Sequence, residues 1–151
     1  MSYSLPEFLA HAIAMENEAA ERYLERADMM EAHDNLEVAN VFRDMHRYST
    51  MHRDSIVERV GSTELPKLKS WQYRWTSPPE VGDEDAFDYM MMPYHALEYA
   101  RENEQRARDF YRSCVGESDD AEVKRLAAEY ADEEQEHTDA LNEWLERTPR
   151  P

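Results

Sequence analysis

Apolar side chains recur at helical spacing in four long stretches of the chain, and signals that begin or end a helix bound each stretch. The first stretch opens on Ser4-Leu5-Pro6-Glu7, which has the residues of a capping box, with Pro in the first turn, where no backbone donor is needed. Glu16 lies inside the apolar stripe that follows, so its carboxylate is expected to face the core. The stripe comprises Leu9, Ala12, Ile13, Ala19, Ala20, Tyr23 and Met30.

A second helix is predicted over residues 35–60, between a capping signal at Asp34-Asn35-Leu36-Glu37 and Gly61. Its inward face is Val38, Val41, Phe42, Met45, Ser49, His52, Ile56 and Val60. The next stretch, 61–92, has weak periodicity and several prolines, which predicts a connection, with a short helical turn at 85–92. Its aromatic residues are expected to form a lid or a dimer contact; they include Trp71, Tyr73 and Trp75.

Two further helices are predicted after this connection. One begins at Pro93 and ends near Gly116, with Leu97, Ala100, Glu104, Ala107 and Tyr111 facing inward. The other is capped by Ser118-Asp119-Asp120 and stops before Pro149; its inward residues are Leu126, Tyr130, Glu134, His137, Leu141 and Trp144 or Leu145.

The lengths of the connections predict how the four helices are arranged. Short turns join the first helix to the second and the third to the fourth, so each pair should be antiparallel. A helix of 25 residues is about 37 Å long, whereas about 30 extended residues reach roughly 100 Å. The sequence therefore predicts an all-α, single-domain protein over 1–151, a four-helix bundle whose long crossover, 61–92, makes the second and third helices parallel.

Composition narrows the possible partners. The net charge of −17 argues against nucleic acid and anionic membranes as partners and favours cations. Cys114, the only cysteine, permits neither a disulfide nor a Cys-x-x-Cys site. No leader pattern and no run of about 18 apolar residues is present, so a soluble cytoplasmic protein is expected.

The inward polar residues repeat along the chain. Glu16, with Tyr23 seven residues later, is echoed by Glu104 and Tyr111, and His52 is echoed by His137 in Glu134-Gln135-Glu136-His137. Taken singly, an inward Glu more often pairs with an Arg or reaches solvent, and Glu-x-x-His arises by chance on acidic helices. Together, at matching depths in a bundle, the five residues predict a buried metal site. Its ligands would be Glu16, His52, Glu104, Glu134 and His137.

Two segments resemble the rubrerythrins of the ferritin-like superfamily. Residues 14–23, AMENEAAERY, are similar to that family's first-helix motif, and residues 131–137, ADEEQEH, to its last-helix motif; the resemblance spans about 8 to 146. It implies a crossover bundle in which two Glu and two Glu-x-x-His motifs hold a pair of metal ions. Iron is the expected metal, as one or two ions, with Mn or Zn as possible substitutes. A homo-oligomer, a dimer, is also expected. The cysteine-rich rubredoxin module of full rubrerythrins is absent.

One residue departs from the family pattern: the second-helix motif here reads Ser49-Thr50-Met51-His52, so the bridging carboxylate that the resemblance implies is missing. Loss of one bridge should weaken the second metal position, because two cations about 3.5–4 Å apart need anions between them. Tyr23, Tyr111 and Tyr130 would support the ligands by hydrogen bonds, or be core tyrosines bonded to other acceptors.

Three functions fit these observations. The first is an oxidoreductase of peroxidase or ferroxidase type, acting on peroxide, O₂ or Fe²⁺; with no second cofactor motif in the chain, peroxide or O₂ reduction would need an external electron donor. The second is a non-catalytic metal-binding or iron-handling protein, which Ser49 favours. The third is a bundle retained as a scaffold, in which five inward polar groups would be expensive without a metal.

If Ser49 stands where the family has a bridging carboxylate, Ser49→Glu should raise the affinity for a second metal ion, because the variant restores the missing anion. Metal analysis of the purified protein at limiting metal concentration is the measurement. An unchanged metal stoichiometry in the variant would contradict this placement of Ser49.

Overall fold

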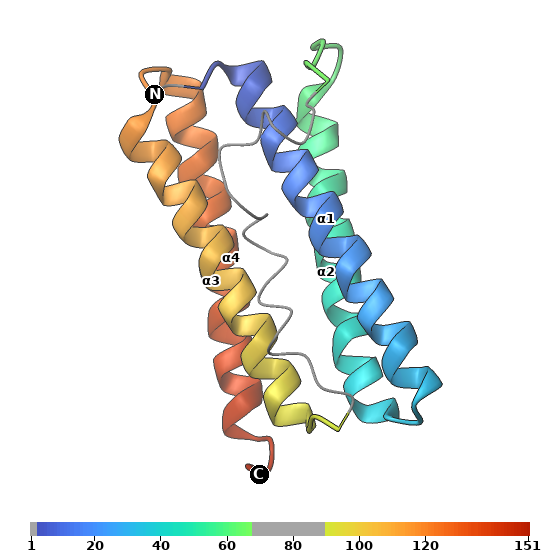
Figure 1. The fold of residues 1–151 in the computed structure, drawn as a ribbon. Helices are drawn as coiled ribbons and strands as arrows, with labels where there is room; N and C mark the ends of the chain where they lie inside the picture. The colour runs from blue at the N-terminus through green and yellow to red at the C-terminus, as the bar shows by residue number, and fades with distance from the viewer. Residues whose placement is uncertain (1–2, 68–89) are drawn as a thin grey trace.

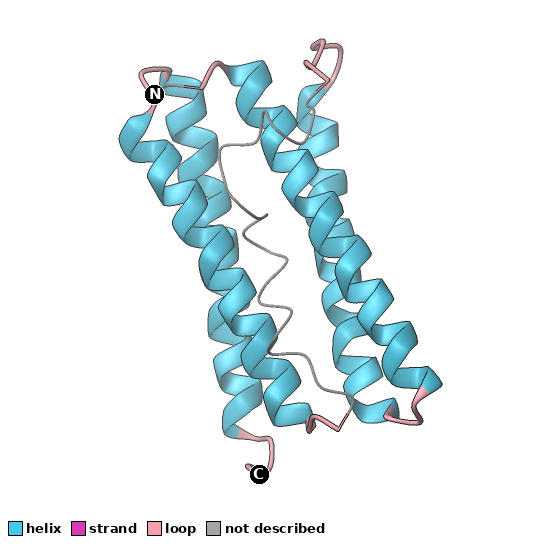
Figure 2. Cartoon of the chain, in the orientation of Figure 1, coloured by secondary structure: helices cyan, strands magenta, loops and turns pink. Residues whose placement is uncertain are grey.

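The computed structural model describes residues 3–67 and 90–151, which form four α-helices and, within these ranges, no strand (Figures 1 and 2). They are α1 (Leu5–Ala32), α2 (Leu36–Val60), α3 (Pro93–Glu117) and α4 (Ala121–Glu146). The predicted all-α fold and the four helices are confirmed. Most of the predicted crossover lies outside the described residues, including Trp71, Tyr73 and Trp75 and most of the helical turn expected at 85–92.

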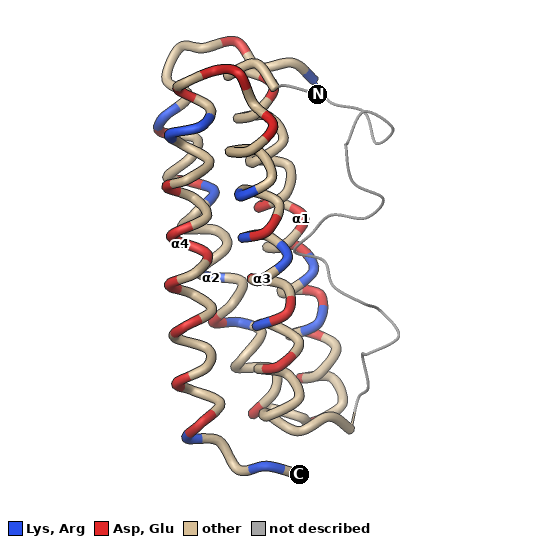
Figure 3. Tube along the Cα trace, turned by 90° about the vertical axis from the view of Figure 1, so that its left-hand side faces the viewer, with Lys and Arg blue, Asp and Glu red and all other residues tan. Residues whose placement is uncertain are grey.

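The helices form two antiparallel pairs. α1 packs along α2, and α3 packs along α4, and Figure 1 shows the two pairs side by side, with α2 and α3 running in the same direction. This is the arrangement that a long connection between α2 and α3 requires. No described helix has an apolar stretch that could cross a bilayer. Charged residues of both signs are spread over all four helices (Figure 3).

Most helix ends follow the signals in the sequence. The Ser4 hydroxyl accepts a hydrogen bond from the Glu7 backbone N–H at 3.3 Å, with Pro6 in the first turn of α1. The Asp120 carboxylate accepts from the N–H groups of Glu122 and Val123 at 2.8 and 3.2 Å. Gly61 ends α2 at a φ of 56°, a conformation that costs glycine little.

The start of α2 differs from the prediction. Asn35 occupies the N-cap position, but its side chain makes no capping hydrogen bond. Its Nδ2 instead donates to the backbone carbonyl of Met91 at 2.8 Å. The side chain therefore ties the turn between α1 and α2 to the segment that leads into α3, a contact across 56 residues that local sequence cannot indicate.

The apolar core is divided into two clusters. In the Phe8 cluster, the Phe8 ring lies 6.0 Å from that of Tyr130 and 6.2 Å from that of Tyr111. In the Phe42 cluster, the Phe42 ring lies 6.2 Å from that of Tyr23 and 6.0 Å from that of Tyr99. Each helix passes from one cluster to the other through a buried polar residue. The dividing residues are Glu16 in α1, Ser49 and His52 in α2, Asn103 and Glu104 in α3, and Glu134 and Thr138 in α4.

Phe8→Ala should lower the free energy of unfolding by about 3–5 kcal/mol, because it opens a cavity beneath two tyrosine rings. Urea unfolding followed by circular dichroism is the measurement, with Leu24→Ala as the control, since Leu24 is 38% exposed. An equal loss in both variants would contradict the assignment of Phe8 to a close-packed cluster.

Candidate metal centre

The five residues that the sequence predicts as metal ligands come together in the layer between the two apolar clusters. Glu16, Glu104 and Glu134 have 1% or less of their surface exposed, and His52 has 6%. The His137 side chain is 30% exposed, so this imidazole reaches toward solvent. Every helix contributes at least one of the five, which places three carboxyl groups and two imidazoles in one small region.

Three of these residues form a first group of donor atoms, from α1, α2 and α4. Nδ1 of His52 lies 2.8 Å from Oε1 of Glu16 and 3.1 Å from Oε1 of Glu134. The three donor atoms of the group lie within 4.8 Å of one another, close enough to surround one ion.

A second group joins α3 to α4. Nδ1 of His137 lies 3.6 Å from Oε2 of Glu104 and 3.5 Å from Oε2 of Glu134. Glu134 therefore belongs to both groups, with Oε1 directed to His52 and Oε2 to His137. A carboxylate whose two oxygens face two separate donor sets is placed to bridge a pair of ions.

The donor atoms suit a cation by their chemistry, and those of Glu134 and His52 have ion-pair contacts in place of hydrogen bonds. Neither oxygen of Glu134 and neither ring nitrogen of His52 makes a hydrogen bond of acceptable geometry within the described residues. The ion pairs found for Glu134 are with histidines. Leaving a buried carboxylate uncompensated costs several kcal/mol. Carboxylate oxygen with imidazole nitrogen is a ligand set that Fe²⁺, Mn²⁺ and Zn²⁺ accept, so the residues fit a metal pair.

The electrostatics of the layer show what a metal would replace. Burial, and next the negative charge of Glu104, raise the pKa of Glu134 well above its ordinary value. Burial opposes the charged form of His137, but Glu104 and Glu134 outweigh it and raise its pKa to about 10. The pKa of His52 is likewise raised, because Glu16, Glu133 and Glu134 together outweigh its burial. Protons therefore compete with metal for these atoms, and metal binding should release them.

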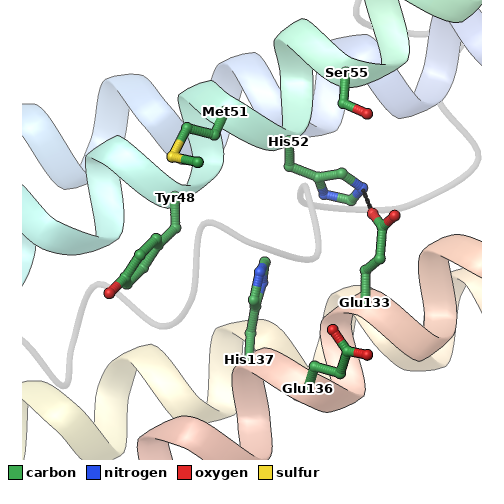
Figure 4. A pocket seen from close by; sticks show the side chains of 7 residues that line it. All are labelled: Tyr48, Met51, His52, Ser55, Glu133, Glu136 and His137. Atoms are coloured by element: carbon green, nitrogen blue, oxygen red, sulfur yellow. Dashed lines mark ion pairs between the residues drawn. The ribbon is translucent and has the colours of Figure 1, made fainter.

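Sequence reasoning missed Glu133. Its Oε2 lies 2.8 Å from Nε2 of His52, and this contact lowers the pKa of Glu133 (Figure 4). The carboxylate holds the ring from the side opposite Glu16 and leaves Nδ1 directed into the layer. Periodicity alone places Glu133 off the inward face of its helix, next to Glu134. Only the approach of α4 to α2 reveals its role.

The predicted supporting residues have different surroundings. The Tyr111 hydroxyl donates to Oε1 of Glu16 at 3.2 Å, across the bundle from its own helix. The Tyr23 hydroxyl accepts from Nδ2 of Asn103 at 3.3 Å. Burial raises the pKa of Tyr130 to about 12, and its hydroxyl makes no hydrogen bond within the described residues, while its ring lies 5.4 Å from that of His52. Ser49 is buried, with 3% of its surface exposed.

A cavity of about 220 Å³ gives solvent access to both imidazoles (Figure 4). It opens between α2 and α4, and the Tyr48 ring stacks against that of His137 at 6.0 Å beside it. Small molecules can therefore approach the centre from this side. The lining residues are Tyr48, Met51, His52, Ser55, Glu133, Glu136 and His137.

Comparison with known proteins finds a matching protein family and similar solved structures. The sequence model of the ferritin-like domain matches residues 4–150. A crystal structure of an uncharacterized conserved protein from Magnetospirillum magnetotacticum MS-1 is similar, with 60% identity and a TM-score of 0.75 over 99% of this chain and 98% of that one. No curated protein matches.

Glu134→Gln should stabilise the metal-free protein at pH 8 by about 1 to 3 kcal/mol, because it removes a buried charge that Glu104 repels. A raised folded-state pKa means that the stabilising contribution of Glu134 is present at low pH and lost as pH rises. The advantage of glutamine should therefore shrink toward pH 5. Thermal unfolding in a chelator at pH 5 and pH 8 is the measurement.

Glu136→Gln is the matched control, since Glu136 lines the same cavity but is exposed. It should leave the stability at both pH values unchanged within about 0.5 kcal/mol. A Glu134→Gln variant that is less stable than the parent at pH 8 would show that the carboxylate has a compensating partner in the metal-free protein.

Proposed function

The chain belongs to the ferritin-like domain family, and on this premise we propose that it is a rubrerythrin-type oxidoreductase that binds two metal ions, iron by preference, and reduces peroxide. The observation that carries the proposal is the position of Glu134, which directs one oxygen to each of two Glu–His groups. A single-metal site would need one such group. Two groups that share a carboxylate fit a pair of ions.

The residues divide the work of holding such a pair. Glu16 and His52 would hold one ion, Glu104 and His137 would hold the other, and Glu134 would be shared by both. Iron, when bound, would supply the redox chemistry. Tyr111 orients Glu16 through its hydrogen bond, and Glu133 fixes the His52 ring. The apolar clusters above and below the layer shield its three glutamates from bulk water, which strengthens the charge interactions of these carboxylates.

Access and electron supply complete the proposal. The cavity between α2 and α4 admits a molecule the size of peroxide to the two imidazoles. Electrons would come from an external donor, because the sequence carries no motif for a second redox cofactor. The negative field of the chain, with 34 acidic against 17 basic residues, favours entry of Fe²⁺ and docking of a positively charged donor.

A second candidate function is iron handling without turnover, and Ser49 favours it. α2 offers a buried hydroxyl three residues before His52, where α4 offers Glu134 three residues before His137. Weaker retention of the second ion would suit a protein that takes up and releases iron. The two candidates share the ligands and differ in whether peroxide turns over.

Anaerobic loading with Fe²⁺ followed by peroxide separates the two functions. The oxidoreductase should bind about two irons per chain, show their oxidation by absorbance on adding peroxide, and return to the starting spectrum with a chemical reductant over repeated cycles. Iron handling predicts binding without repeated turnover. His137→Ala should lose about one iron per chain, because it removes a ligand of one group only.

Glu136→Gln is the control for that variant, because it changes the adjacent residue in the same cavity without removing a donor of either group. A parent protein that binds no iron, and whose melting temperature does not change with Fe²⁺ or Zn²⁺, would leave only the scaffold function.

A further inference from the structure

Ser49 marks an imbalance between the two halves of the centre. α4 places Glu134 and α2 places Ser49 at the same distance before a histidine, and both residues are buried at the level that divides the two apolar clusters. The rings of Tyr48 and His137 stack at 6.0 Å, which brings the turn of α2 that holds Ser49 against the second donor group. Ser49 therefore lies where a fourth carboxylate would complete the layer.

With two divalent ions bound, the centre would carry an excess of positive charge. Three buried glutamates bring three negative charges, whereas two divalent ions bring four positive ones. One positive charge is left in a layer enclosed by apolar side chains, and an uncompensated buried charge costs several kcal/mol. A single monoanion would remove this excess and also reduce the repulsion between the two ions.

Within residues 3–67 and 90–151, no neighbouring side chain is placed to supply that anion. Met45, one turn before Ser49, is apolar and fully buried in the Phe42 cluster. Glu133 is the nearby carboxylate, but it contacts Nε2 of His52, while Nδ1 of the same ring faces Glu16 and Glu134. The imidazole ring thus separates Glu133 from the donor atoms of the centre. Glu136 is exposed at the cavity.

The cavity supplies a route for an external anion. Its volume of about 220 Å³ suits a molecule of a few non-hydrogen atoms, and its walls include Tyr48, one residue before Ser49, and His52, three residues after it (Figure 4). Ser49 itself is buried and does not line the cavity, so a guest would accept a hydrogen bond from its hydroxyl only after passing inward from the cavity. Glu133 and Glu136 line the same cavity, so their charges oppose anion entry until metal ions are present.

We propose that a small carboxylate of the size of formate or acetate binds beside Ser49 and takes the place of the missing side-chain carboxylate when both metal positions are filled. This inference rests on the metal pair of the proposed function. It makes affinity for the second ion depend on the anion, and affinity for the anion depend on the metal. The two dependences are reciprocal because both are one coupling free energy.

Calorimetric titration with Co²⁺ tests the inference in a non-coordinating buffer, with sodium acetate or sodium perchlorate at equal ionic strength. The second Co²⁺ should bind about tenfold more tightly in acetate. The visible absorption of the Co²⁺-loaded protein should change with acetate, whereas the metal-free protein should bind no acetate. The parent protein alone decides the question, so the test does not depend on the folding of a variant.

Two variants sharpen the result. Ser49→Glu should bind the second Co²⁺ tightly in perchlorate and lose the acetate effect, because the side chain now provides the anion. Ser55→Glu is the matched control: it adds the same charge to the same helix, at an exposed position on the cavity, and should keep the acetate effect.

Three outcomes would overturn the inference. Equal affinity for the second Co²⁺ in both salts would show that no anion takes part in binding, and it would not contradict the metal pair. Loss of the second Co²⁺ in perchlorate from Glu133→Gln, when the parent retains it, would show that Glu133 supplies the charge. Binding of one ion or none in both salts would contradict both the proposed metal pair and the proposed anion.

Discussion

Three carboxyl groups buried in one layer of an apolar bundle are the constraint on which the rest of this structure depends. Glu16, Glu104 and Glu134 lie where all four helices pass from the Phe8 cluster to the Phe42 cluster. In such surroundings negative charge persists only with positive charge beside it. The layer meets this need with two histidines of raised pKa and with a geometry that accepts cations. The same buried residues that limit the stability of the metal-free bundle thus provide the donor atoms for a cation.

The centre is asymmetric, although the chain repeats itself. α4 contributes a carboxylate and an imidazole, and Glu134 is shared by both donor groups. α2 contributes an imidazole and a hydroxyl, from His52 and Ser49. The cavity opens between these two helices, so solvent reaches the centre from the side on which α2 provides Ser49 in place of a carboxylate. A ferritin-like fold does not decide which reaction follows. Here the missing carboxylate at Ser49 and the solvent-accessible cavity both lie on the α2 side of the centre.

Residues outside the donor groups fix the orientation of the donors. Tyr111 reaches from α3 to Glu16 in α1, and Glu133 reaches from α4 to His52 in α2. Each contact joins helices of different antiparallel pairs, so each also helps to hold one pair against the other. Orientation of the ligands and docking of the two helix pairs therefore depend on the same hydrogen bonds and ion pairs. A change in either contact would affect both the stability of the bundle and the geometry of its centre.

Helical periodicity in the sequence determined the four helices and the five residues of the layer, because a repeat of 3.6 residues fixes which side chains share a face. The lengths of the connections determined the directions of the helices. The periodicity also identified Ser49 as the departure from the repeat. It could not find Glu133, or the pairing of Tyr111 with Glu16, or the donation from Asn35 to Met91. Those contacts depend on how far each helix is rotated and shifted against another, and on the side-chain rotamers chosen there. Only packing of the whole bundle sets these quantities, so the tertiary structure alone decided that Glu134 faces both histidines.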